Sequence, residues 1–217
     1  MAEENKAPEE EFETIKLLSE KDLYLKWKTW SVDERYEALT KQKLTVQFLK
    51  DHMDEINWYA VSVNMNLTCD ILDEFSKKIK WAALCMSPNA VSDVILYNYY
   101  MYMDWPIIMS KQFLDMKLLV ALSEKYRKSR SKKAKIFWNS VCKYQKLDAD
   151  YVDAYKRFMN FKYISMNGNI EDEVFDKYIK YFDIPVFLKA KKIEPSILEK
   201  HSAYIQSALA EEENTNG

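Results

Sequence analysis

A tandem repeat constrains the fold of this chain more than any other feature. The sequence LTVQFLKDHMDEINWYAVSVNMN begins at Leu44, and LTCDILDEFSKKIKWAALCMSPN begins 23 residues later at Leu67. A second pair that aligns without gaps begins at Leu147 and Ile170. A repeat of this length encodes one supersecondary unit, which cannot bury its apolar face alone and therefore stacks on its neighbours.

Six copies cover residues 44–192, and a truncated seventh extends from 193 to about 206. One extra residue, Ala90, precedes the third copy, and the fourth copy is ten residues longer than the others. Every copy starts at an apolar residue, in turn Leu44, Leu67, Val91, Leu114, Leu147, Ile170 and Ile193. A second apolar site follows fourteen positions later, or 24 in the long copy: Trp58, Trp81, Trp105, Trp138, Phe161 and Ile184.

The first part of each copy has the spacing of an amphipathic helix. Apolar residues at offsets 0, 4, 5, 8 or 9, and 12 from the start fall on one helical stripe. The residue after the start is a good helix N-cap in five copies: Thr45, Thr68, Ser92, Asp115 and Asp148. We therefore predict a first helix of about three turns in each copy.

A second helix of about two turns is predicted around the second apolar site. Capping residues stand just before this site in four copies: Asn57, Asp104, Asn160 and Asp183. Pro106 and Pro185 fall in the first turn of this helix, where a missing N–H costs little. A polar stretch ends each copy, and Gly168 fits a left-handed helix stop there.

The composition favours the same fold class. Only two glycines and five prolines occur, whereas a large β-protein needs many more turn residues. We predict an all-α fold, an α-solenoid of about six 23-residue helix-pair repeats with irregular terminal caps. The expected parts are a disordered acidic tail at 1–13, an N-terminal helical cap at 14–43, the repeat domain at 44–206 and a disordered acidic tail at 207–217.

The repeated phrase has the form W-x-x-[IVL] followed by L-[ST/D]-x-x-[FIY]. It reads WYAVSVNMNLTCDI at 58–71, WNSVCKYQKLDADY at 138–151 and FKYISMNGNIEDEV at 161–174. This pattern resembles the tandem short helical repeats of proteins from large double-stranded DNA viruses, over about 160 of the 217 residues. The resemblance implies a viral origin and an α-solenoid, and it carries over no catalytic residues. The chain departs from the pattern at Ile184 and in the long fourth copy.

No set of catalytic residues stands out. His52 and His201 lie far apart, no His/Cys cluster has zinc-ligand spacing, and one internal glycine cannot build a phosphate loop. Cys69, Cys85 and Cys142 do not suggest a disulfide framework, and buried thiols are favoured over a Cys–His nucleophile pair, which the sequence leaves open. We predict that the protein is not an enzyme and has no catalytic residues, metal or cofactor.

The aromatic residues have two interpretations. The tryptophans of the second apolar site could form a stacking platform for bases, or a ladder of buried aromatics between repeats. Their phase within the apolar stripe favours the ladder, so we assign a structural repeat core of Trp58, Trp81, Trp105, Trp138, Phe161 and Ile184. The Met- and Tyr-rich segment 97–109 is expected to be core too, although methionine also suits adaptable binding surfaces.

One segment of the long fourth copy breaks the repeat. The sequence KYRKSRSKKAK at 125–135 has seven basic residues: Lys125, Arg127, Lys128, Arg130, Lys132, Lys133 and Lys135. Insertions in repeat proteins often project from one edge and carry the specific contact, which predicts a site for phosphate, nucleic acid or an acidic protein face. A solvated, extended helix or loop explains the segment equally well.

These features predict a protein that binds other macromolecules through a repeat surface. The leading hypothesis is a non-enzymatic viral structural or adaptor protein, for example a minor capsid-associated component of a virion. The alternatives are an intracellular protein that sequesters a host factor, and a nucleic-acid-binding accessory protein that uses 125–135. A net charge of −2 argues against nucleic-acid binding by the whole surface.

The expected location follows from what the chain lacks. No run of 18 apolar residues is present, and the acidic start of the chain does not resemble a signal peptide. We therefore expect a protein that does not insert into membranes and is not secreted, found in the virion or in the cytoplasm or nucleus of the host cell.

Overall fold

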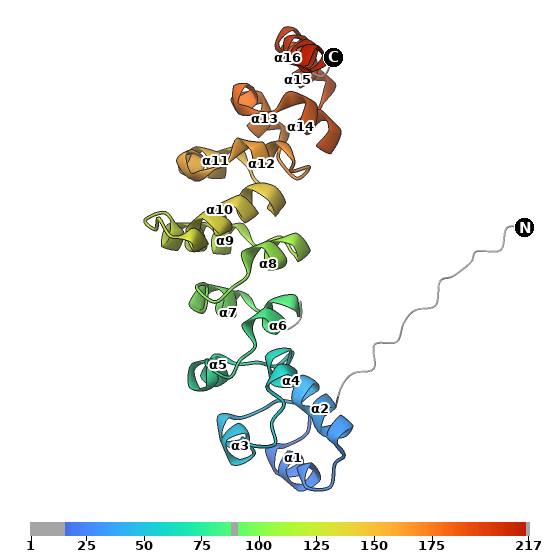
Figure 1. Cartoon of the computed structure of the whole chain (residues 1–217), viewed down its shortest axis with the longest axis vertical. Coiled ribbons are helices and arrows are strands. Elements are labelled where there is room, and N and C mark those ends of the chain that lie inside the picture. The colour runs from blue at the N-terminus through green and yellow to red at the C-terminus, as the bar shows by residue number, and fades with distance from the viewer. Residues whose placement is uncertain (1–15, 88–90, 216–217) are drawn as a thin grey trace, which may run out of the picture. The chain divides into compact units, whose positions relative to one another are not determined.

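The computed structural model describes residues 16–87 and 91–215, and these residues are helical with no strand (Figure 1). A single parallel bridge joins Leu147 and Ile170. The elements are α1 (Glu20–Trp27), α2 (Val32–Lys41), α3 (Val46–Asp51), α4 (Trp58–Ser62), α5 (Cys69–Phe75), α6 (Trp81–Met86), α7 (Asp93–Asn98), α8 (Trp105–Lys111), α9 (Met116–Tyr126), α10 (Lys132–Tyr144), α11 (Ala149–Tyr155), η1 (Lys156–Phe158), α12 (Phe161–Ser165), α13 (Asp172–Tyr178), η2 (Ile179–Tyr181), α14 (Ile184–Ala190), α15 (Pro195–Lys200) and α16 (Ser202–Thr215).

Capping side chains begin the helices where the sequence predicts. The Asp148 carboxylate accepts a hydrogen bond of 2.7 Å from the Tyr151 N–H at the start of α11. The Asn57 side chain accepts from two N–H groups at the start of α4. Pro106 and Pro185 both lie in the first turn of their helices, as expected. Thr68 occupies the cap position of α5 without a side-chain hydrogen bond.

Two local predictions are wrong. Most of the first helices are shorter than three turns, for example six residues in α3 and seven in α11, whereas α9 of the long fourth copy has 11 residues, the predicted length. A 3-10 turn extends α11 and α13. Gly168 does not stop its helix in the left-handed conformation, because no described glycine has a positive φ. Its role is close approach, since a Cβ at Gly168 would lie 2.8 Å from the carbonyl oxygen of Ala190.

The helices form two compact units, Met1–Leu84 and Cys85–Gly217, although the sequence suggested a single repeat domain. In the first unit, α2 packs against α4 and α3 packs against α5. In the second unit, α8, α10, α12 and α14 pack in succession and form a second-helix row (Figure 1). On the other side of that unit, α7 packs against α9 and α11 against α13.

The repeat-core positions are buried to different degrees. Trp105, Trp138 and Ile184 are buried, whereas Trp58, Trp81 and Phe161 are only half-buried. Trp105 packs edge-on against Phe137 with ring centroids 5.3 Å apart. The six side chains therefore line the packing surface between helices, and the three half-buried ones, all aromatic, also reach solvent.

A small hydroxyl or thiol side chain recurs one residue after the buried aliphatic site of the second helix. In the fifth copy, the Ser165 hydroxyl accepts a 2.9 Å hydrogen bond from the Asp183 N–H, at the start of α14, the second helix of the sixth copy. Cys142 takes the same position with its thiol, 3.4 Å from the Asn160 nitrogen. The equivalent bonds elsewhere are Ser62 with Lys80, and Cys85 with Asp104.

Three buried amide side chains bond carbonyl groups of the preceding unit, which is the N-terminal cap for Asn64 and the preceding repeat for Gln145 and Asn167. Asn167 Nδ2 donates to the carbonyl oxygens of Cys142 and Gln145, at 3.0 and 2.8 Å. Its Oδ1 accepts from the Asn169 N–H at 2.9 Å. In the same way, Asn64 donates to Leu39 and Gln42, and Gln145 donates to Met109 and Gln112. Each amide therefore satisfies carbonyls at the end of a second helix, which the helix itself leaves unpaired.

The chain ends differ from expectation in part. The N-terminal cap forms as two helices, with Leu23, Trp27 and Leu39 buried, while Leu17, Leu25 and Tyr36 remain exposed. The acidic tail expected at 1–13 lies outside the described residues. The prediction of a disordered tail at 207–217 is wrong for 207–215, because α16 continues to Thr215.

We expect Asn167→Ala to lower the free energy of unfolding by about 1–3 kcal/mol, because it leaves two buried carbonyl groups without their donor. Chemical denaturation followed by circular dichroism measures the change. Gln47→Ala is the matched control, since it removes only an exposed hydrogen bond to Asp51 and should cost less than about 0.5 kcal/mol. Equal effects of the two variants would contradict a role for the buried amide.

Candidate interaction surface

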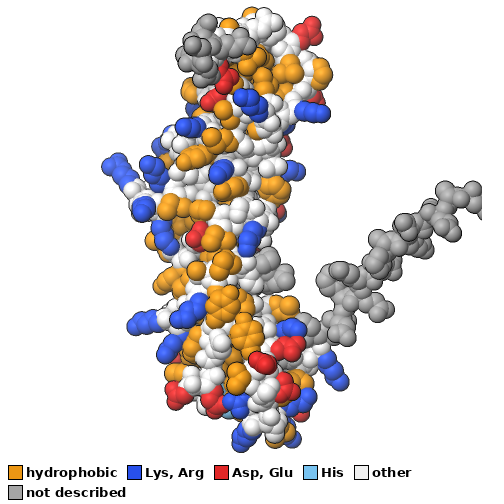
Figure 2. All heavy atoms as spheres, turned by 45° about the vertical axis from the view of Figure 1, so that its right-hand side comes forward, with side chains coloured by type: hydrophobic (Ala, Val, Ile, Leu, Met, Phe, Trp, Pro, Cys, Tyr) orange, Lys and Arg blue, Asp and Glu red, His pale blue; other side chains and the backbone are white. Residues whose placement is uncertain are grey.

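The ten additional residues of the fourth copy lengthen a helix pair. α9 has 11 residues and α10 has 13, and residues 127–131 connect them at one edge of the second unit (Figure 1). The Ser131 hydroxyl caps α10 by accepting from the Ala134 N–H at 3.1 Å. The basic segment is therefore the end of a helical hairpin. Figure 2 shows Lys and Arg side chains projecting from this edge.

Two of the seven basic residues of the predicted site hold the hairpin against α7 and the residues that follow α7. The Lys125 ammonium lies over the Tyr97 and Tyr100 rings, 3.7 and 4.6 Å from their centroids. Lys133 Nζ donates a hydrogen bond to the carbonyl oxygen of Met101. Cation–π contacts of this kind contribute about 0.5–1 kcal/mol at partly exposed sites. Lys125 and Lys133 therefore position the hairpin.

Arg127 is neutralised within its own helix end. Its guanidinium donates to both carboxylate oxygens of Glu124, each at 2.8 Å. The Tyr155 hydroxyl also donates to Glu124, at 2.9 Å. The bonds from Arg127 and then from Tyr155 lower the pKa of the Glu124 carboxyl. Burial raises the pKa of Tyr155 to about 12, and the bond to Glu124 adds to this shift.

The other four basic residues, Lys128, Arg130, Lys132 and Lys135, are exposed, and we call them the basic tip. Within the described chain none of them forms an ion pair. Lys132 and Lys135 also stand with Lys133 near the start of α10, which has no acidic residue in its first turn. The helix dipole disfavours cations there. The positive charges of the basic tip are thus not neutralised by ion pairs with the described residues.

Aromatic residues beside the hairpin are more exposed than the sequence predicted. Of segment 97–109, Met103 and Met109 are buried as expected, but Tyr97, Met101 and Tyr102 are exposed. Tyr97 and Tyr102 expose 40% and 51% of their surface, enough to offer a ring to a partner. Sequence reasoning missed these residues because their apolar neighbours follow the repeat and hide which side chains turn outward.

The structure gives the candidate nucleophiles and ligands other roles. Burial raises the pKa of the Cys142 thiol to about 12, and it also raises the pKa of the Cys85 thiol. His52 packs against the Phe48 ring at a centroid distance of 4.8 Å, and His201 bonds Asp176 at 2.6 Å. Among the residues described, no group of three or more His, Cys, Asp or Glu side chains could hold a metal ion.

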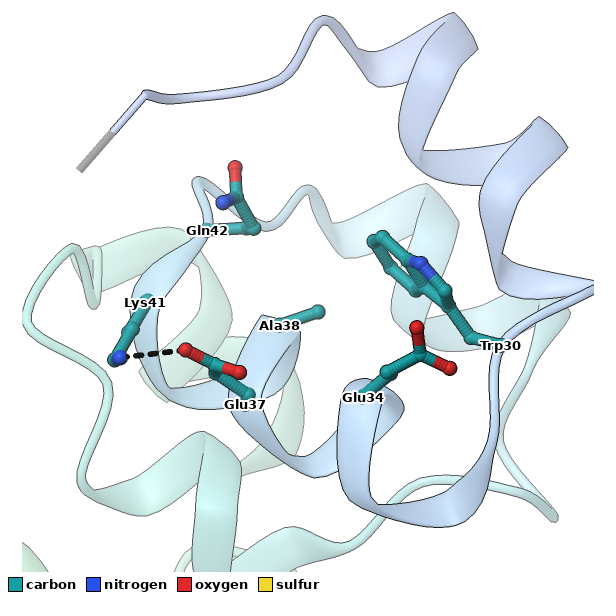
Figure 3. A pocket seen from close by; sticks show the side chains of 6 residues that line it. All are labelled: Trp30, Glu34, Glu37, Ala38, Lys41 and Gln42. Carbon is teal, nitrogen blue, oxygen red and sulfur yellow. Dashed lines mark hydrogen bonds and ion pairs between the residues drawn. The ribbon is translucent and has the colours of Figure 1, made fainter.

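A shallow cavity of about 230 Å³ lies on the N-terminal cap, lined by Trp30, Glu34, Glu37, Ala38, Lys41 and Gln42 (Figure 3). Its charged groups already have partners. Glu37 pairs with Lys41 at 2.6 Å, and Glu34 completes the capping box with Ser31. These carboxylates therefore stabilise α2, and they leave no polar group directed at a ligand.

No family model matches the chain, and neither the curated proteins nor the solved structures contain a significant match. The resemblance to viral helical repeats therefore remains a prediction. Along the described segments, every helix is too short or too polar to cross a membrane.

We expect the native protein to show one fast-reacting thiol, at Cys69, which is half-buried, and two slow ones at Cys85 and Cys142. A buried thiol with a raised pKa carries almost no thiolate at neutral pH, so it reacts slowly. Titration with a chromogenic disulfide, with and without denaturant, measures this, and Cys69→Ser identifies the fast thiol. Fast reaction of Cys142 in the folded protein would show an activated nucleophile.

Proposed function

We propose that this chain is a non-enzymatic structural or adaptor protein, built as an α-solenoid, that binds an acidic face of another protein. The basic tip of the α9–α10 hairpin is the docking site. The observation that carries the proposal is the set of four exposed cations, Lys128, Arg130, Lys132 and Lys135, none of which forms an ion pair among the described residues.

The hairpin suits docking because its base is held in place. The Tyr126 hydroxyl donates to the carbonyl oxygen of Tyr100 at 3.0 Å and accepts from Trp105 Nε1 at 2.9 Å. Lys125 and Lys133 add contacts to the same neighbouring segment. A tip presented on a rigid base loses less conformational entropy when a partner binds.

The start of α10 adds an electrostatic reason. Three lysines at the positive end of a helix destabilise it, typically by a few tenths of a kcal/mol to 1 kcal/mol each. A sequence that breaks a local rule marks a candidate functional site. An anionic partner reverses this cost, because it neutralises the lysines and also interacts favourably with the helix terminus.

The repeat resemblance favours one form of this proposal, a minor component of a viral particle that joins other particle proteins. A protein that sequesters a host factor is the alternative within the same class. Both need a binding surface and no catalytic groups.

Nucleic-acid binding is the second candidate, and an exposed tyrosine beside the hairpin supports it. The Tyr97 ring lies against Lys125, and rings next to cations are the features that bind single-stranded nucleic acid. However, Tyr97 already stacks under Lys125, so only one of its faces is open to a base. We therefore rank a protein partner first.

The test is affinity capture of native complexes with the tagged full chain, followed by mass spectrometry with and without nuclease. A triple variant, K128E/R130E/K132E, should lose the captured proteins, because each substitution replaces attraction by repulsion. The matched control is K21E/K26E/K28E, three exposed lysines of the N-terminal cap, which should retain them.

The result expected is recovery of the same proteins in fixed ratio, insensitive to nuclease. Partners that vanish with nuclease would favour the nucleic-acid candidate. Unchanged recovery with the tip variant would overturn the assignment of the docking site, and the far-ultraviolet circular dichroism of both variants establishes that they fold.

A further inference from the structure

Acidic residues are absent from the second helices of the described repeats. The helices α4, α6, α8, α10, α12 and α14 contain no Asp or Glu. The first helices α5, α11 and α13, in contrast, carry several, such as Asp150, Asp153 and Glu173. In the second unit, all charged side chains within the helices of the second-helix row are therefore cationic. They are Lys111, Lys132, Lys133, Lys135, Lys143, Lys162 and Lys189.

Two adjoining cavities hollow this row. One, of about 240 Å³, lies between the ends of α8 and α10 and is lined by Met109, Ser110, Lys111, Gln112, Phe113, Lys143, Tyr144 and Asn169. The other, of about 220 Å³, is lined by Pro106, Ile136, Asn139, Ser140, Lys143, Tyr144 and Tyr163. Because Lys143 and Tyr144 line both, the two cavities adjoin on α10, and we call the pair together the second-helix groove.

The lining combines apolar and cationic groups and has no carboxylate. Phe113, which exposes 55% of its surface to solvent, lines the first cavity, and the half-buried Tyr163 lines the second. The Lys143 ammonium lies 5.1 Å from the Tyr144 centroid, between the two cavities. Figure 2 brings this side of the second unit forward and shows hydrophobic side chains next to Lys and Arg.

We propose that the second-helix groove binds an extended acidic peptide segment that carries an aromatic side chain. Two adjoining cavities suit an extended segment, because its alternate side chains point to the same face and one can enter each cavity. The aromatic side chain packs on Phe113 or Tyr163, and a flanking carboxylate pairs with Lys143. The groove lining contains lysines and no carboxylate, which favours the approach of a negative segment, and Asp104 and Asp183 stand at the starts of α8 and α14 as N-caps.

This site is separate from the basic tip. Lys143 follows Lys132 by eleven residues on α10, which places it roughly 16 Å further along the helix axis. Loss of binding at one site therefore leaves the other intact, and failure of this proposal does not decide the proposed function.

The experiment measures fluorescence anisotropy of a labelled peptide that has one phenylalanine between two runs of glutamate, added to the full chain. Lys143→Glu should weaken binding by about tenfold or more, since it places a carboxylate against the ligand's own. Phe113→Ala should weaken this peptide but not a second peptide with alanine in place of the phenylalanine. Phe113 is exposed, so its removal has little effect on the fold.

Lys26→Glu, the same charge change on the N-terminal cap, is the matched control and should leave the affinity unchanged. Equal weakening by Lys26→Glu and Lys143→Glu would overturn the proposal, because it indicates attraction by overall charge. Weakening by Lys128→Glu that equals or exceeds the effect of Lys143→Glu would also overturn it, because it indicates binding at the tip. Absence of binding to the wild type overturns it as well, as does tighter binding of an oligothymidylate of equal charge, which would assign the groove to nucleic acid.

Discussion

Hydrogen bonds between buried amides and the carbonyl ends of neighbouring helices connect the repeats of this protein. Helices of five to seven residues are too short to be stable alone, and their ends expose more unpaired backbone groups than their middles satisfy. Gln145 shows how this is resolved. Its side chain bonds carbonyls of the third copy, while its own carbonyl accepts from Asn167 of the fifth. Three successive copies are thereby joined through one residue.

The same constraint explains why cysteines and serines interchange. Ser62, Cys85, Cys142 and Ser165 occupy one repeat position, and each receives an N–H from the start of a following second helix. A thiol is a weaker acceptor than a hydroxyl but fills an apolar site better. The buried thiols therefore belong to the packing between repeats, and their raised pKa values follow from that burial.

The two candidate binding surfaces lie outside these contacts between repeats. The long fourth copy adds turns to α9 and α10 beyond the stacked core, so its basic tip meets solvent rather than a neighbouring repeat. The second-helix groove arises differently, from side chains between α8, α10 and α12 that the packing does not fill. Both surfaces are cationic although the chain has a net charge of −2, because the acidic residues lie elsewhere: near both ends of the sequence, in the N-terminal cap, and in first helices such as α11 and α13.

The sequence by itself determined the helical class, the helix starts and the irregular fourth copy, because caps, prolines and apolar spacing act within one turn of chain. It also exposed the second apolar site, but not that Trp105 is buried while Trp58 and Trp81 are half-buried. Only the tertiary structure decided which of the seven basic residues remain free, since Lys125 and Lys133 find partners in α7 and the residues that follow it. The groove and the bonds of the buried amides also became visible only in the tertiary structure. Each brings together residues 20 or more positions apart, and the spacing of residues along the chain does not predict such contacts.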